Sequence, residues 1–335
     1  MSASGVSASG VRAFGGRALP LAGRYGVVAA LALLILFGAA RYDYFLGAFN
    51  VLSFLRYNSM FALVSLGMAF VIMTGGIDLS VGAVAALGSV ASALASGLGW
   101  APGLLAGLAA GLGAGLLNGA LVVRLRIAPF IATLATMLAA NGCALLLAHN
   151  ESVSVSYDTG FTEIGQGDWL GLPVPAWIAL GAYVAGSVVL NVTGLGRTVL
   201  ATGGGEDAAR LMGLRVDRAK WTVYAASGTL AGMAGVILAA QFGAGQPIEG
   251  VGWELFAIAA VVVGGTLLTG GEGSVGTTLA GALLLGLIFN ILNFENGRGF
   301  ISLSAYWQSV IRGLFLLAVV VMQAKLSGRA AAHDT

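Results

Sequence analysis

The sequence predicts an all-α, polytopic membrane protein with about ten transmembrane helices. Of its 335 residues, 58% are hydrophobic and only 9% are charged, whereas a soluble domain carries roughly a quarter charged residues. The apolar runs are also long, since residues 104–123 reach the ~20 residues needed to cross a bilayer. So few charged side chains cannot form the surface of one large soluble domain.

The apolar segments divide the chain into a membrane domain and two tails. Residues 1–24 are predicted to be a cytoplasmic N-terminal tail, residues 25–323 the membrane domain, and residues 324–335 a cytoplasmic C-terminal tail. The predicted helices are residues 25–40, 57–74, 80–97, 103–123, 128–148, 174–193, 221–241, 253–269, 275–294 and 304–323.

The distribution of arginine and lysine predicts the orientation. With the N-terminus inside, the inner segments hold twelve of these residues and the outer segments hold three. The longest outer segment, residues 149–172, holds none. Cytoplasmic loops of membrane proteins carry such an excess of positive charge, so we expect both termini to face the cytoplasm.

Glycine recurs at every fourth residue in the predicted helix at 103–123. This spacing places the glycines on one helix face, and in lipid such a face lets another helix backbone approach closely. Glycine is abundant throughout the chain, with 53 residues, but the unbroken register favours a packing face. These glycines are Gly103, Gly107, Gly111, Gly115 and Gly119.

Sequence motifs for catalysis or cofactor binding are missing. Lys220 and Lys325 are the only lysines and each follows alanine, so the chain has no Walker A site. A match to GxGxxG at residues 271–276 lies between apolar segments and not in a strand-turn-helix unit. Lone Cys143 indicates no metal site, and the net charge of +2 does not indicate nucleic-acid binding. We expect no enzyme activity, no metal and no cofactor in this chain.

The stretch TGGIDLSVG, residues 74–82, interrupts two apolar segments. Gly75 and Gly76 can adopt backbone angles that other residues avoid, and Asp78 beside Ser80 can cap a helix start. A carboxylate in hydrocarbon costs roughly 2.5–3.5 kcal/mol, so we expect Asp78 near an edge or with a partner. Its main role is expected to be that cap; the other interpretation is a broken helix whose polar backbone lines a solute pathway.

Other polar residues are placed within the predicted helices. Glu254 and Asn290 are candidates for the lining of a pathway, whereas Asn118 is expected to form a hydrogen bond between helices. Pairs of glycines also precede Ser-Val-Gly at residues 274–276, as they do at residues 80–82. This short repeat is compatible with a duplicated transporter fold.

The predicted inner loop, residues 194–220, contains a segment able to form two helical turns. Glu206 and Asp207 lie at its start and Arg210 follows, which suits the helix dipole, and Gly213 can end the helix. Leu211 and Met212 would be exposed unless something covers them. The segment is therefore either a helix on the membrane surface or a docking helix for a cytoplasmic partner.

Several motifs together resemble the permease subunits of ribose/xylose/galactoside-type ABC sugar importers. The resemblance runs from about residue 52 to residue 322. The motifs are GGIDLSVG at residues 75–82, NG at 118–119, RI at 126–127, PFIATL at 129–134, AARLMG at 208–213, EL at 254–255, AIAAVV at 257–262 and GGT at 264–266.

The resemblance implies the ABC importer permease fold in a bacterial inner membrane, and it implies the partners. A separate cytoplasmic ATPase would bind ATP and Mg, a second permease, identical or homologous, would complete the pore, and a periplasmic sugar-binding protein would deliver a pentose or hexose. The loop at residues 203–214 would contact the ATPase. The implied coupling residues are Gly203, Gly204, Glu206, Ala208, Ala209, Arg210, Leu211 and Gly213.

Two positions depart from the family pattern, and one rival function stays open. Gly205 and Phe256 stand where an asparagine and an aspartate are usual. Residues 264–269, with Asn293, Phe294 and Trp307, are most similar to a permease of galactofuranose importers. The rival is an ion-coupled secondary carrier that acts alone, for which Asp78 and Glu254 are the acids available.

Overall fold

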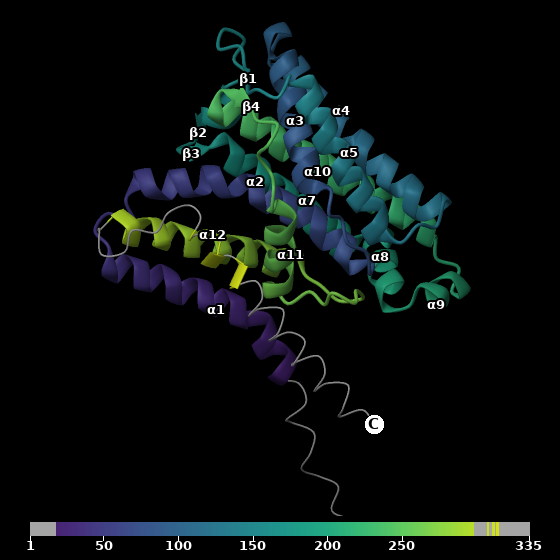
Figure 1. Cartoon of the computed structure of the whole chain (residues 1–335). Helices are drawn as coiled ribbons and strands as arrows, with labels where there is room; N and C mark the ends of the chain where they lie inside the picture. Colours follow the sequence, from purple (N-terminus) through teal and green to yellow (C-terminus); the bar gives the residue numbers. More distant parts are fainter. Residues whose placement is uncertain (1–17, 298–306, 308–309, 312, 315–335) are drawn as a thin grey trace, which may run out of the picture.

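The computed structural model describes residues 18–297, 307, 310–311 and 313–314 (Figure 1). It confirms an all-α protein, because the strands in this part of the chain are two residues long each. Most of the predicted tails and of the predicted helix at 304–323 lie outside the described residues. The first helix begins inside the segment 1–24 that the sequence predicted to be a tail.

The long helices form two groups that cross each other (Figure 1). One group consists of α3, α4, α5 and α10, and the other of α1, α2 and α12, with α11 beside α2. The bounds are α1 Ala18–Arg41, α2 Ala48–Met73, α3 Val81–Ala95, η1 Ser96–Leu98, α4 Trp100–Gly119, η2 Ala120–Arg124, α5 Pro129–Leu147, α6 Glu163–Gln166, α7 Val174–Val192, α8 Gly194–Gly204, α9 Glu206–Leu211, α10 Val216–Phe242, α11 Trp253–Val263 and α12 Val275–Gly297.

Within the described residues, seven helices are long and apolar enough to cross a membrane. Two more apolar helices, residues 26–41 of α1 and all of α11, are shorter. The sequence predicted one continuous helix at 253–269, but α11 ends at Val263. The helix ends because Gly264 and Gly265 follow, and Gly265 has a φ of +85° that a helix does not allow.

The glycine face of α4 packs against α10. A Cβ at Gly111 would overlap the carbonyl oxygen of Gly228, and a Cβ at Gly115 would overlap the carbonyl oxygen of Tyr224. The contact is reciprocal, because a Cβ at Gly228 would overlap the carbonyl oxygen of Gly111. Gly103, Gly107 and Gly119 are buried on the same face. The two backbones are therefore as close as helices can come, which gains dispersion contact without side chains.

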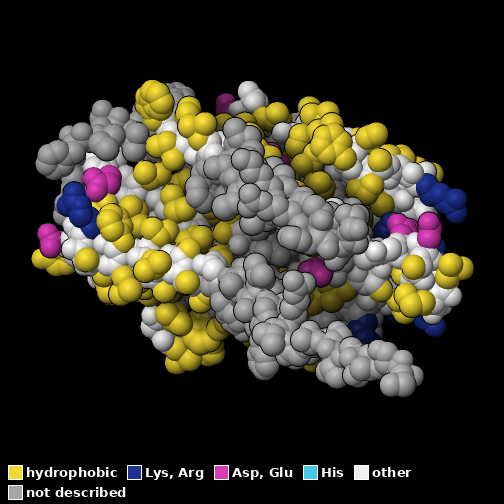
Figure 2. Space-filling model, turned by 90° about the horizontal axis from the view of Figure 1, so that it is seen from below, with side chains coloured by type: hydrophobic (Ala, Val, Ile, Leu, Met, Phe, Trp, Pro, Cys, Tyr) yellow, Lys and Arg dark blue, Asp and Glu magenta, His cyan; other side chains and the backbone are white. Residues whose placement is uncertain are grey.

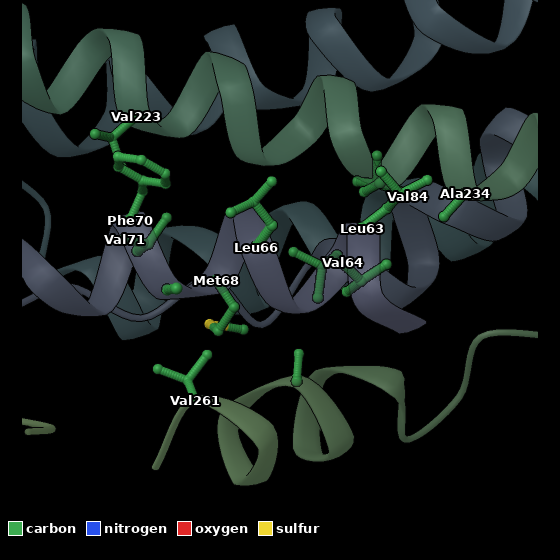
Figure 3. Close-up of a cluster of buried hydrophobic side chains, with 14 of the residues drawn as sticks. Leu63, Val64, Leu66, Met68, Phe70, Val71, Val84, Val223, Ala234 and Val261 are labelled. Carbon is green, nitrogen blue, oxygen red and sulfur yellow. The ribbon is translucent and has the colours of Figure 1, made fainter. Parts of the chain in front are cut away.

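The hydrophobic core surrounds α2. Figure 3 shows Leu63, Leu66 and Phe70 of α2 on the side of α10, and Met68 on the side of Val261 of α11. The second half of α2 is buried without interruption from Ala62 to Met73. Because α2 is covered on all sides there, it shows no amphipathic period.

Two small sheets lie at one end of the bundle, here called the strand end (Figure 1). The first pairs β1, Val153–Ser154, with β4, Ala244–Gly245, and the second pairs β2, Asp168–Trp169, with β3, Leu172–Pro173. The helix α9 lies at the opposite end, the α9 end. In the view of Figure 2, hydrophobic side chains cover most of the described surface, and most visible charged side chains lie near the left and right edges, as expected of a membrane-embedded chain.

Candidate functional site

The chain breaks between α2 and α3 at residues 74–80. Gly75 has a φ of +79°, and the N–H of Gly76 donates to the carbonyl oxygen of Val71 at 3.1 Å, which closes the end of α2. The helix α3 then starts at Val81, directly after Ser80. The glycines thus produce a turn that other residues would resist.

A second break between α11 and α12 repeats this sequence pattern. Gly270 and Gly271 have φ values of +84° and +83°. The helix α12 starts at Val275, just as α3 starts at Val81, and in both helices Ser-Val-Gly is the start. The sequence similarity between residues 74–82 and 270–276 therefore corresponds to two equivalent helix breaks.

The two breaks meet the end of α8 at one point, here called the glycine junction: Gly75, Gly203, Gly270 and Gly271. The N–H of Gly271 donates to the carbonyl oxygen of Met73 at 3.1 Å. A Cβ at Gly203 would overlap that same carbonyl oxygen and the nitrogen of Gly271, and a Cβ at Gly270 would lie 2.6 Å from the nitrogen of Gly75. Segments that are distant in the sequence are therefore in backbone contact, with no side chain between them.

The short helix α9 follows this junction directly. The N–H of Gly213 donates to the carbonyl oxygen of Arg210 at 2.9 Å, and the N–H of Leu214 to that of Ala209 at 3.1 Å. With Gly213 at a φ of +78°, these bonds form a Schellman motif. The expected helix and its glycine stop are both present, but residues 194–204, which the sequence left as a loop, form the helix α8.

The surface of α9 has an apolar tip and a charged base. Leu211 is 90% exposed and Met212 is 68% exposed, whereas Ala209 is fully buried. At the base, Nζ of Lys220 donates to Glu206 at 2.5 Å, and the Arg210 guanidinium bridges Glu206 at 3.0 Å and Asp217 at 2.5 Å. Ala208 and Gly204 are both exposed. The ion pairs thus fix α9 to the start of α10 and leave its tip free.

The same ion pairs hold Glu206 in its charged form. Burial raises the pKa of the Glu206 carboxyl, but hydrogen bonds from Lys220 and Arg210 lower it by more, so the net pKa lies below its usual range. A carboxyl with a lowered pKa contributes stability above its ordinary pKa and loses it only as the pH falls through the lowered value. The base of α9 is therefore intact at neutral pH.

Asp78, which we expected near an edge or with a partner, is fully buried and has partners. Its Oδ1 accepts from the N–H and hydroxyl of Ser80 at 3.0 and 2.6 Å and from Asn118 at 3.3 Å. Its Oδ2 accepts from the hydroxyl of Ser227 at 2.8 Å. Asp78 does bind the start of α3, but it also joins α4 and α10 to the break. Asn118 of α4, for which we expected a hydrogen bond between helices, donates instead to Asp78 and Ser80 in the break before α3.

Residues 244–252, which comprise β4 and the chain from β4 to α11, have no helical structure. This segment runs antiparallel to α3: Gly245 lies against Val90, the N–H of Gln246 donates to the Ser89 hydroxyl at 3.0 Å, and Gly250 lies against Gly82. Irregular backbone at membrane depth occurs only where protein buries it or where it lines a cavity. The sequence analysis missed this broken span because its residues resemble an ordinary loop.

A cavity of about 840 Å³ lies beside this segment, on the strand-end side of α11. Its walls are the first half of α2, the start of α11 and the second half of α12. On α2 the lining residues Phe54, Tyr57, Asn58 and Phe61 follow a helical spacing of three, four and seven residues. That spacing is the signal in the sequence by which this wall could have been found.

The remaining candidates divide between this cavity and the packing. Asn290 lines the cavity and exchanges two hydrogen bonds with Asn50, at 2.9 and 3.3 Å. Glu254 is outside the cavity lining and accepts from the N–H of Gly252 at 3.2 Å, beside Gly82 of α3. No group of three metal-binding side chains occurs in the part of the chain that the structure describes.

Comparison with known proteins gives the chain a family. The family described as "Branched-chain amino acid transport system / permease component" matches residues 50–320. The ribose import permease protein RbsC of Bacillus subtilis strain 168 is 41% identical over 286 residues, which cover 84% of this chain and 87% of that protein. No solved structure matches the chain.

Two further relatives are named for the transport of other sugars. The L-arabinose transport system permease protein AraH of Escherichia coli K12 is 36% identical over 89% of each chain. The D-allose transport system permease protein AlsC of the same strain is 33% identical over 91% of this chain and 92% of that protein. A chain similar to these relatives along most of its length, with apolar helices able to span a membrane, belongs to the sugar ABC importer permeases, which are multi-pass proteins of the bacterial inner membrane.

Proposed function

We propose that this chain is the membrane-spanning subunit of an importer that moves a monosaccharide inward, driven by a separate ATPase. The α9 end faces the cytoplasm in this proposal, because the excess of arginine and lysine lies there. The strand end then faces the periplasm and a sugar-binding protein. A second permease, identical or homologous, completes the pore, and ATP and Mg are bound by the ATPase.

The glycine junction is the observation that supports this proposal most directly. A docking partner that moves α9 moves α8, and the end of α8 is in backbone contact with the breaks after α2 and α11. Both helices extend from the junction to the wall of the cavity. A push on α9 therefore has a contiguous mechanical path to the proposed solute pathway.

The coupling role assigns separate tasks to the residues of α8 and α9. Leu211 and Met212 form an exposed apolar contact for the ATPase. Glu206 and Arg210 hold the helix in place through their ion pairs, and Gly213 ends it. Gly203 allows the close approach of backbones and Ala209 is buried, whereas Ala208 and Gly204 are small, exposed residues beside them. The cargo is a pentose or hexose, and galactofuranose belongs in the panel of sugars to be tried.

The docking role is tested by placing a charge on the tip of α9. Leu211→Glu adds a carboxylate at a fully exposed position, so the fold is expected to be unchanged. We expect the purified chain to lose binding to its ATPase by at least about tenfold. Leu125→Glu is the matched control, because Leu125 is 64% exposed in the turn between η2 and α5 and does not belong to α9. Equal ATPase binding by both variants would contradict the proposal.

A further inference from the structure

The cavity described above has the chemistry of a binding site for a neutral, polyhydroxylated ring. Three aromatic residues stand together on its wall: the ring centroids of Phe61 and Trp253 are 4.7 Å apart, and those of Phe61 and Phe256 are 4.6 Å apart. Aromatic rings provide flat apolar contact area that is rigid. The C–H face of a sugar ring is a flat apolar surface of the same kind.

Amide groups lie around these rings. Gln241, Asn58 and Asn290 line the cavity. The Oε1 atom of Gln241 is buried and has no hydrogen-bond partner among the described residues. A buried acceptor without a partner is unusual in a folded protein. Rotation of the Gln241 side chain toward the cavity would let a sugar hydroxyl donate to this oxygen. The cavity thus pairs apolar rings with a few convergent polar groups, as ligand sites do.

The charges of the lining distinguish a sugar from an amino acid. No lysine or arginine is among the described lining residues, and Glu249 is the one carboxylate there. An amino acid carries both an ammonium and a carboxylate, and burying an unpaired charge is costly. A neutral solute leaves no unpaired charge buried in this cavity. The lining therefore selects against the branched-chain amino acids named in the family description.

The inner side of the cavity is closed by packing between α11 and α12. A Cβ at Gly281 would overlap the carbonyl oxygen of Ala260, and a Cβ at Gly264 would lie 2.7 Å from the carbonyl oxygen of Thr277. Ala259 and Leu285, which also line the cavity, are buried in this contact. A solute in the cavity is therefore held on the strand-end side until α11 and α12 separate.

We propose that this cavity is the entry site for the sugar, where Phe61 and Phe256 stack on the sugar ring and Gln241 accepts from a hydroxyl. The inference rests on the proposed function, because it places the cavity on the periplasmic side. The sugar must leave the cavity after it enters, so the cavity binds it weakly. Substitutions in the cavity should therefore change the rate of transport rather than a measurable equilibrium affinity.

The test compares sugar uptake with ATP hydrolysis in vesicles that contain the whole importer and its loaded binding protein. Phe256→Ala and Gln241→Ala are expected to lower the sugar carried per ATP by at least about tenfold, with ATP hydrolysis retained. Phe49→Ala, at an 87% exposed position of the same helix as Phe61, is the control. An unchanged ratio in both cavity variants would overturn the proposal. An unmodified importer without sugar-dependent uptake would instead overturn the proposed function.

A second measurement covers the case in which the cavity variants do not assemble. Cys143 is replaced by serine, and Ser53, which lines the cavity, is replaced by cysteine and labelled from outside with a charged maleimide. A label on Leu46→Cys, 61% exposed in the turn before α2, is the control. We expect only the cavity label to block uptake. Uptake at the unlabelled rate by a fully labelled Ser53→Cys importer would contradict the proposal.

Discussion

Glycine has opposite effects in the two halves of the molecule. Between α4 and α10, Gly111 and Gly228 lie within helices and bring two backbones into direct contact, so these helices form one tightly packed unit. Gly75 directly after α2, and Gly270 between α11 and α12, have positive φ values and interrupt the helical structure. The same residue type therefore produces a rigid half where φ is helical and a hinge-containing half where φ is positive.

The two halves also differ in what fills the space between their helices. Glycine brings the backbones of α3, α4 and α10 into contact, whereas large rings and amides surround a cavity between α2, α11 and α12. Two packed surfaces with interlocking backbones resist sliding, while a contact around a cavity can change at lower cost. The helices α11 and α12 also touch through their backbones, at Gly281 and Gly264, but the cavity lies between this pair and α2. We therefore expect the α4–α10 unit to be the fixed frame and the α11–α12 pair to be the part that moves.

The largest expected effect comes from disrupting the rigid half. Gly111→Leu places a side chain where the carbonyl oxygen of Gly228 lies, so the helices must separate. We expect a loss of more than about 4 kcal/mol in the free energy of unfolding, because overpacking here displaces backbone rather than side chains. Thermal unfolding in detergent measures this loss.

Gly113→Leu is the control for that experiment, because a Cβ at Gly113 of the same helix meets nothing within 4 Å. Gly113→Leu makes the same change of residue type in the same helix, but at an exposed position. Equal unfolding temperatures for the two variants would show that the glycine face is not a packing contact.

A smaller effect is expected at the seam between the halves. Asp78→Asn replaces one carboxylate oxygen, which accepts from Ser80 or Ser227, with an amide donor. We expect a loss of about 1–3 kcal/mol, since a buried polar group in the cluster then loses its hydrogen-bond partner. Unfolding of Asp207→Asn, at an exposed position of α9, gives the baseline. No difference between the two variants would mean that the polar cluster does not join α3 to α4 and α10.

Much of the fold could be predicted from composition and period. Apolar length predicted the long helices, and the four-residue glycine spacing coincides with the face of α4 that is buried on α10. The buried position of Asp78 could not be predicted, because its donors Asn118 and Ser227 lie 40 and 149 residues away in the sequence. The residues next to Asp78 in the sequence predict a helix cap, but they give no sign of the partners that the tertiary fold brings to it.

The functional site shows the same limit. The sequence identified Gly75 by its local turn chemistry and Gly203 only through the family resemblance. Nothing local indicates that Gly75, Gly203 and Gly270 touch. The extended segment 244–252 was missed for a similar reason, because short polar and glycine-rich stretches read as loops whether they lie at the surface or beside α3.

The most direct test of the account concerns the glycine junction. Gly203→Ala overlaps the carbonyl oxygen of Met73 and the nitrogen of Gly271, whereas a Cβ at neighbouring Gly204 meets nothing within 4 Å. The measurement is sugar uptake per ATP hydrolysed by the reconstituted importer. We predict that Gly203→Ala still assembles with its ATPase but carries at least about tenfold less sugar per ATP, while Gly204→Ala matches the unmodified chain. Equal coupling in the two variants would contradict the claim that ATP-driven motion reaches the cavity through this junction.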